Sequence, residues 1–169
     1  MRQLNYSDLI DLYKINLQQY SIDQLRHVSE RGVWSLGQMY DHMILTALDY
    51  LDQVQRCASM SEVQLQGKTE AGNQLFCAGS FPPIKIRLPD GPENTPSNSE
   101  TVDDLIRGLD TVLQRMYEWE ENLNAINPNY KVRHEGFGWL NAREWFDLVG
   151  MHFRHHLRQK AELDLKLEF

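Results

Sequence analysis

Cysteine is scarce in this sequence, and the two residues present, Cys57 and Cys77, are too far apart to form a C-x-x-C motif. A small secreted protein held together by disulfides would carry more cysteines. We therefore expect two free thiols in a protein of the reducing cytoplasm. The sequence also lacks an apolar run of membrane-spanning length, and its first residues lack the apolar segment of a signal peptide.

Positive charge is also in short supply. The 17 Lys and Arg are outnumbered by 24 Asp and Glu, so the formal net charge is −7 and the isoelectric point is about 5.3. A nucleic-acid-binding face needs an excess of Lys and Arg, and a membrane anchor based on charge needs a cluster of them. The charge balance argues against both partners. A homodimer remains open.

Long stretches of helical periodicity are what the sequence does contain. With 169 residues, 41% of them hydrophobic, we expect a single domain, residues 1–169. Apolar residues recur at i, i+3 and i+4 within residues 5–31, 35–57, 101–125 and 141–159. Capping-box patterns begin two of these stretches, at Ser35 and at Thr101. The pattern contains no convincing hairpin, and it predicts an all-α fold, an antiparallel four-helix bundle.

Residues 59–100 separate the second and third of these stretches and lack their periodicity. Gly, Pro, Ser and Asn are frequent there, and Phe81-Pro-Pro and Thr95-Pro-Ser interrupt regular structure. The alternation in Ile84-Lys-Ile-Arg-Leu predicts an extended segment. Connections of this length are usually either functional or disordered. Its apolar residues favour a long extended insertion that covers the bundle, with the Phe and Ile side chains of residues 76–90 packed over the helices.

Two histidines lie on the apolar stripe of the last predicted helix. Asn141 can cap this helix, with Glu144 completing a capping box. At 100° per residue, a sector about 100° wide holds most of the apolar side chains and the two histidines. Its members are Trp145, Leu148, Val149, His152, His156 and Gln159. Because His152 and His156 are i, i+4 neighbours, their rings can converge on a single ion.

Two interpretations of this pair are open. A buried histidine often hydrogen-bonds polar groups of the core, and the H-x-x-x-H spacing is a weak motif by itself. Burying two imidazoles costs free energy unless their nitrogens find partners, and one metal ion would satisfy both. A third ligand would favour the metal. His42 is the best candidate, because it borders the apolar face of residues 35–57 and adjacent bundle helices bring facing side chains together.

Three segments together resemble the DinB/YfiT-like superfamily. They are Trp34-Ser-Leu-Gly-Gln-Met-Tyr-Asp-His42, Phe81-Pro-Pro-Ile84, and a C-terminal segment that runs from His134-Glu-Gly-Phe-Gly-Trp-Leu to His152-Phe-Arg-His155-His156-Leu-Arg-Gln159. The likeness covers roughly residues 30–160 and is greatest to a bacterial branch with the signature H-P-x-F-G-x-L…E-W…H-x-x-H-H-L-x-Q. Glu135 stands where that signature has proline, so we expect the loop before the last helix to differ.

The resemblance implies a four-helix bundle that binds a divalent metal, zinc or nickel, through His42, His152 and His156. Similar proteins include transferases and isomerases that use a low-molecular-weight thiol such as bacillithiol, mycothiol or glutathione. Three neutral imidazoles leave a coordination position open, where a bound thiol is held as thiolate at neutral pH. The implied function is a metal-dependent enzyme that transfers this thiol to an electrophilic small molecule.

Two other functions remain open at this stage. One is hydrolysis of a small ester or amide by metal-bound hydroxide, although no carboxylate has an obvious general-base spacing from the histidine pair. The other is a non-enzymatic metal-binding helical protein. In an enzyme, Gln159, His155, His134 and Asp49 are candidates to support the ligands or to contact the substrate. For His134 and Asp49, an ordinary surface position is the simpler interpretation.

Overall fold

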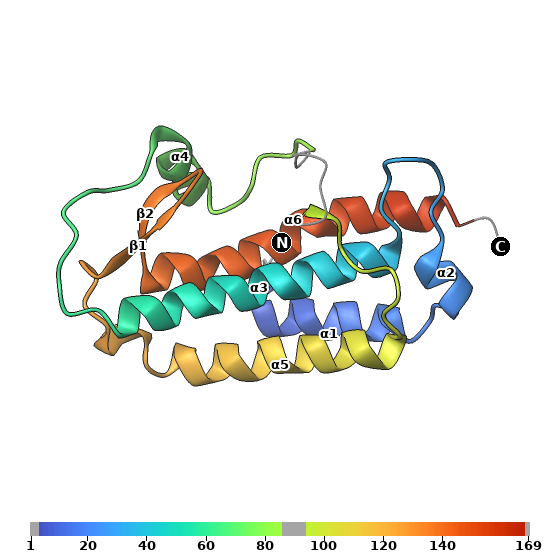
Figure 1. The fold of residues 1–169 in the computed structure, drawn as a ribbon, viewed down its shortest axis with the longest axis horizontal. Coiled ribbons are helices and arrows are strands. Elements are labelled where there is room, and N and C mark those ends of the chain that lie inside the picture. Colours follow the sequence, from blue (N-terminus) through green and yellow to red (C-terminus); the bar gives the residue numbers. More distant parts are fainter. Residues whose placement is uncertain (1–3, 86–93, 168–169) are drawn as a thin grey trace.

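Four long helices lie side by side in the computed structural model, which describes residues 4–85 and 94–167 (Figure 1). They are α1 (Tyr6–Leu17), α3 (Leu36–Ala58), α5 (Val102–Glu120) and α6 (Ala142–Leu165). Helix α3 packs against α5 and α6, and α1 packs against the same two helices from the other side. The prediction of a mostly helical protein is confirmed, and α3 and α6 share the most extensive helix interface.

Local sequence signals begin these helices where they were predicted. The capping boxes at Ser35 and Thr101 both form, each with the reciprocal pair of side-chain and backbone hydrogen bonds. Asn141 caps α6 by accepting a hydrogen bond from the backbone N–H of Glu144 at 2.9 Å. The carboxylate of Glu144 is directed elsewhere, because it accepts hydrogen bonds from Lys68 Nζ at 3.1 Å. The N-terminus of α6 is thereby tied to the long connection.

A buried core fixes α3 against α1 and α6. The hydroxyl of Tyr13 donates to the carbonyl of Phe153 at 2.7 Å, and the hydroxyl of Tyr40 donates to the carbonyl of Tyr13 at 3.0 Å. All three side chains are less than 2% exposed, so these bonds satisfy polar atoms that water cannot reach. Within the described residues, none of the helices is long and apolar enough to cross a membrane.

The expectation of an all-α fold with no hairpin is wrong for residues 131–141. Strands β1 (Lys131–His134) and β2 (Gly138–Asn141) pair antiparallel, with Val132 opposite Leu140. Each strand has four residues and buries only one or two side chains, so the sequence shows too little alternation to predict it. Gly138, with φ +83°, supplies the left-handed backbone conformation that the turn requires.

The prediction of an extended segment over residues 59–100 also needs correction, because helix α4 (Glu70–Ala78) lies within it. Thr69 caps α4 by accepting from the backbone N–H of Gly72, and Gly79 ends it in the left-handed conformation. The helix was hard to predict because it is short and has a glycine in its first turn. The short helix α2 (Ile22–Arg26) follows α1 and begins with a capping box at Ser21.

Both ends of this long connection are attached to the rest of the protein. Near its start, Thr69 N donates to Phe137 O at 2.9 Å and Trp139 N donates to Gly67 O at 3.1 Å, which joins it to the hairpin. Near its end, Ser97 N donates to the carboxylate of Asp41 on α3 at 2.9 Å. The two attachments determine where the residues between them can lie.

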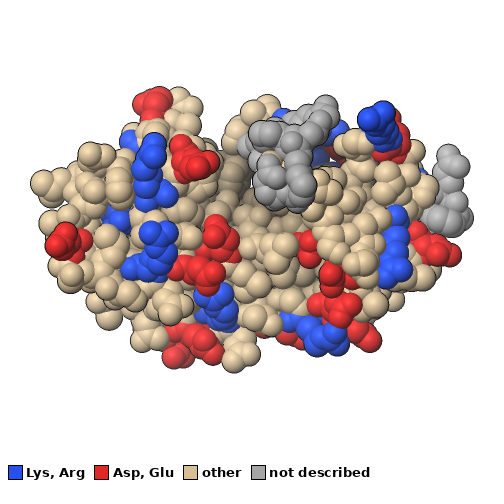
Figure 2. Space-filling view, viewed as in Figure 1, with Lys and Arg blue, Asp and Glu red and all other residues tan. Residues whose placement is uncertain are grey.

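The prediction that residues 76–90 cover the helices holds for the aromatic side chains only. Phe76 and Phe81 are half-buried and pack against the core. Ile84 is 59% exposed, so for this residue the prediction is wrong. Ile86 and Leu88 lie outside the described residues. On the face shown in Figure 2, acidic and basic side chains are interspersed over the described surface.

Replacing Gly72 with alanine should loosen the contact between α4 and the hairpin. A Cβ atom at Gly72 would lie 2.3 Å from the carbonyl oxygen of Phe137, whereas a Cβ atom at Gly67 meets no atom within 4 Å. Overpacking of this kind costs about 1–3 kcal/mol. We expect Gly72→Ala to lower the free energy of unfolding by that amount in urea titrations. Gly67→Ala is the matched control, and equal effects of the two substitutions would contradict this packing.

Candidate metal centre

Three histidines from two helices meet at the interface between α3 and α6. Each of His42, His152 and His156 offers a ring nitrogen, and these three atoms lie within 4.8 Å of one another. His152 and His156 are 7% and 8% exposed, and His42 is half-buried. In the part of the chain that the structure describes, this is the one group of three or more His, Cys, Asp or Glu side chains that can hold a metal ion.

The two histidines of α6 face each other through their Nε2 atoms, which are 3.0 Å apart. His156 Nδ1 lies 2.6 Å from the side-chain oxygen of Gln159. An amide oxygen only accepts, so Nδ1 of His156 carries the hydrogen and Nε2 presents its lone pair toward His152. In the metal-free pair Nε2 of His152 therefore carries the hydrogen and donates it to Nε2 of His156, because two bare lone pairs at this distance would repel each other.

One nitrogen of this cluster is left without a partner. His152 Nδ1 is fully buried and forms no hydrogen bond with any described residue. Such an unsatisfied atom costs free energy, typically about 1–3 kcal/mol. Protein groups alone therefore leave the cluster incompletely satisfied, whereas a bound cation would take one lone pair from each ring. Three imidazole nitrogens also suit zinc or nickel, so the donor set fits a divalent metal ion.

Burial keeps all three rings in the neutral form that metal binding requires. Loss of hydration lowers the pKa of His42 and of His156 to about 4 each, from an ordinary value of about 6.5. Burial, and then the neighbouring imidazoles, also lower the pKa of His152 well below its ordinary value. At neutral pH each ring is therefore neutral and has one unprotonated nitrogen that can bind a metal ion.

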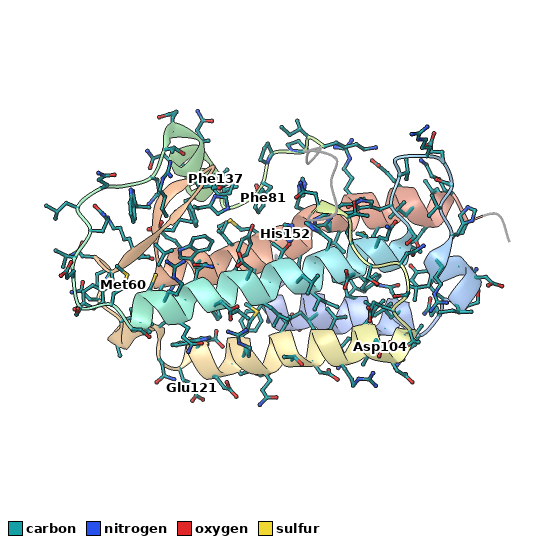
Figure 3. The ribbon with its side chains drawn as sticks, in the orientation of Figure 1. Met60, Phe81, Asp104, Glu121, Phe137 and His152 are labelled. Carbon is teal, nitrogen blue, oxygen red and sulfur yellow. The ribbon has the colours of Figure 1, made fainter. Side chains whose placement is uncertain are left out.

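Aromatic side chains surround the three histidines. The ring of Trp34 lies 4.9 Å from that of His42, and the ring of Tyr50 lies 6.1 Å from that of His152. Phe81, from the long connection, lies 6.0 Å from His152, and Figure 3 shows it between His152 and Phe137. Neither Trp34 nor Tyr50 was among the predicted site residues. For Tyr50, its position two helical turns after His42 was the available signal.

The four additional candidates from the sequence lie in different surroundings. Gln159 contacts His156 directly, and the half-buried ring of His155 lies 5.4 Å from that of Phe81. His134 is on β1, where its ring lies 6.3 Å from that of Tyr50. Asp49 is exposed and accepts a hydrogen bond from Gln53, so it is not among the residues that meet at the three histidines.

The fold and the three histidines together define a class of protein. The chain is a mostly helical protein with a small hairpin and three histidines that can bind a metal ion. A family model described as the DinB superfamily matches residues 11–159, so the chain belongs to the DinB superfamily. The resemblance inferred from the sequence is thereby confirmed. No curated protein and no solved structure matches the chain.

Mild acid should destabilise the metal-free protein. The pKa values of His42 and His156 are lowered to about 4 in the folded state, so below about pH 6.5 the unfolded chain binds protons that the folded chain does not. The contribution of these neutral histidines to the free energy of unfolding is therefore fully present above their pKa in the unfolded chain. It is lost as the pH falls toward their pKa in the folded protein. We expect the urea concentration at the unfolding midpoint to decrease when the pH is lowered from about 7 to about 5.

His42→Phe provides the comparison for this experiment. It keeps a ring beside Trp34 but removes one of the titrating groups, so the dependence of the urea midpoint on pH should become shallower. The same slope in both proteins would contradict the assignment of His42 as a neutral, desolvated histidine.

Proposed function

We propose that this protein is a metal-dependent enzyme that joins a low-molecular-weight thiol to a small electrophilic substrate. In this proposal His42, His152 and His156 hold a divalent ion, zinc or nickel. The ion supplies an open coordination position at which the pKa of a thiol is lowered, so that the thiol is a thiolate at neutral pH. The single observation that carries the proposal is the meeting of three neutral imidazole nitrogens within 4.8 Å.

The protein's own residues contribute orientation and shielding in this proposal. The hydrogen bond to Gln159 keeps the hydrogen of His156 on Nδ1 and leaves Nε2 available as a ligand. Trp34 restricts the ring of His42 from one side. Phe81 lies over His152 and His155, where it limits the access of water to the open position. Exclusion of water strengthens the electrostatic interactions on which activation of a thiol depends.

The proposed fold is the antiparallel four-helix bundle that this site needs. Helices α1, α3, α5 and α6 would form one domain with residues 59–100 as an insertion across it, and the ligands would come from the facing sides of α3 and α6. A small substrate would approach the histidines from the side that carries Phe81.

The purified protein should bind one zinc or nickel ion per chain, and His42→Ala should remove most of that binding. Two imidazoles hold a divalent ion far less well than three, so we expect the affinity to fall by at least about 100-fold. The measurements are elemental analysis and a competitive titration with a coloured chelator. His155→Ala is the matched control, because this histidine is next to His156 but outside the group of three. Full metal retention in His42→Ala would rule out the three-histidine site.

The cobalt-loaded protein should respond to thiols. We expect 2-mercaptoethanol to produce a sulfur-to-cobalt charge-transfer absorption in the near ultraviolet, with saturable binding, because three protein ligands leave a position open. The absorption should be absent in His152→Ala loaded and treated in the same way. A protein that binds cobalt normally but shows no change with thiol would be a metal-binding protein without the proposed thiol chemistry.

A further inference from the structure

Five rings form a closed circuit beside the three histidines. Going round it, the distances between ring centroids are 4.4 Å from His134 to Phe137, 5.8 Å to Phe81, 6.0 Å to His152, 6.1 Å to Tyr50, and 6.3 Å back to His134. The hairpin, the long connection, α6 and α3 all contribute to it. Between His134 and His152 lie the rings of Phe137 and Phe81 on one side and the ring of Tyr50 on the other.

The hydrogen bonding of His134 fixes which of its nitrogens carries the hydrogen. Its Nδ1 accepts from the backbone N–H of Gly136 at 3.0 Å and from the backbone N–H of Phe137 at 3.2 Å. Backbone N–H groups only donate, so Nδ1 must be unprotonated and the neutral ring carries its hydrogen on Nε2. The hairpin turn thus holds an N–H donor in a set tautomer and orientation.

This N–H group is available to a ligand. Among the described residues no acceptor bonds to Nε2 of His134, and this atom is not one of the buried side-chain atoms that lack a partner. The ring is half-buried, stacked on Phe137 at an angle of 20°. A donor that is held rigidly and left unbonded loses little entropy when an acceptor arrives.

Two negatively charged groups near His134 disfavour an anionic hydrogen-bond acceptor. The carboxylates of Asp49 and Glu135 are close enough to act electrostatically on the ring. An anionic ligand would be repelled by these two groups, whereas a neutral carbonyl oxygen would not. The neighbouring rings of Phe137 and Phe81 are half-buried and offer apolar surface to the body of the same ligand.

We propose that His134 is a substrate-binding residue whose Nε2–H donates a hydrogen bond to the neutral carbonyl oxygen of an aromatic substrate lying against Phe137 and Phe81. The inference rests on the proposed function, because it assigns the substrate class of the same site. It names an aromatic ketone, aldehyde or amide as the class of electrophile. It assigns His134 a role in substrate binding. His42, His152 and His156 remain the proposed metal ligands.

The test compares two unreactive probes of the same shape, acetophenone and ethylbenzene, of which only the first has a carbonyl oxygen. Binding to the metal-free and the zinc-loaded protein is followed by NMR titration. Acetophenone should bind about fivefold to tenfold more tightly than ethylbenzene, the difference expected for one hydrogen bond. In His134→Asn, whose Oδ1 can still accept from the turn, this preference should disappear while ethylbenzene binds as before.

His27→Asn is the matched control, a histidine substitution at the C-terminal end of α2, and it should keep the preference. Nitrogen-15 NMR should also show the Nε2–H tautomer of His134 at neutral pH. Equal binding of the two probes, an unchanged preference in His134→Asn, or an Nδ1–H tautomer would each overturn the proposal. Because the probes are unreactive and the metal-free protein is included, these results are independent of the thiol test with cobalt.

Discussion

Desolvation of three imidazole rings between α3 and α6 is the constraint on which the site depends. Each ring loses hydration when the helices pack, and the free-energy cost of this loss is smaller for a neutral ring than for a charged one. The core supplies the stabilisation that keeps the rings in place, because the buried hydroxyl of Tyr13 joins α1 to α6 and that of Tyr40 joins α3 to α1. The result is a set of neutral nitrogens that face one another and leave His152 Nδ1 unsatisfied.

The surroundings of the site depend on a different set of interactions, those that anchor the long connection. The partly buried ion pair between Lys68 and Glu144 joins the connection to the first turn of α6. Backbone hydrogen bonds of Thr69 and Gly67 join it to the hairpin, as in a short third strand. With these contacts in place, Phe81 lies over His152. The residues that cover the histidines are thus held by contacts distant from them.

The chain belongs to the DinB superfamily, and three of its histidines lie close enough together to bind one metal ion. The hairpin adds a feature that a pattern of three ligands does not include. Two backbone N–H groups of the hairpin donate hydrogen bonds to Nδ1 of His134, so the neutral ring carries its hydrogen on Nε2, and the ring of Tyr50 lies between this histidine and His152. The three histidines lie on α3 and α6, whereas this oriented N–H group lies on the hairpin.

The sequence by itself determined the long helices and the histidine pair, because both depend on local geometry. Ser35, Thr101 and Asn141 cap helices through residues within three positions of them, and the i, i+4 spacing of His152 and His156 fixes their common side. Residue pattern and family resemblance also pointed to His42, but only as a candidate, since its position relative to α6 depends on how two helices pack.

Only the tertiary structure decided the hairpin, helix α4 and the neighbours of the histidines. Strands of four residues carry too little alternation to be recognised, and they form because Val132 and Leu140 are buried against the helices. The position of Phe81 beside His152 follows from contacts between segments far apart in the chain. Periodicity in a single segment contains no information about which distant segment will pack against it, so these parts of the site become visible only in the folded protein.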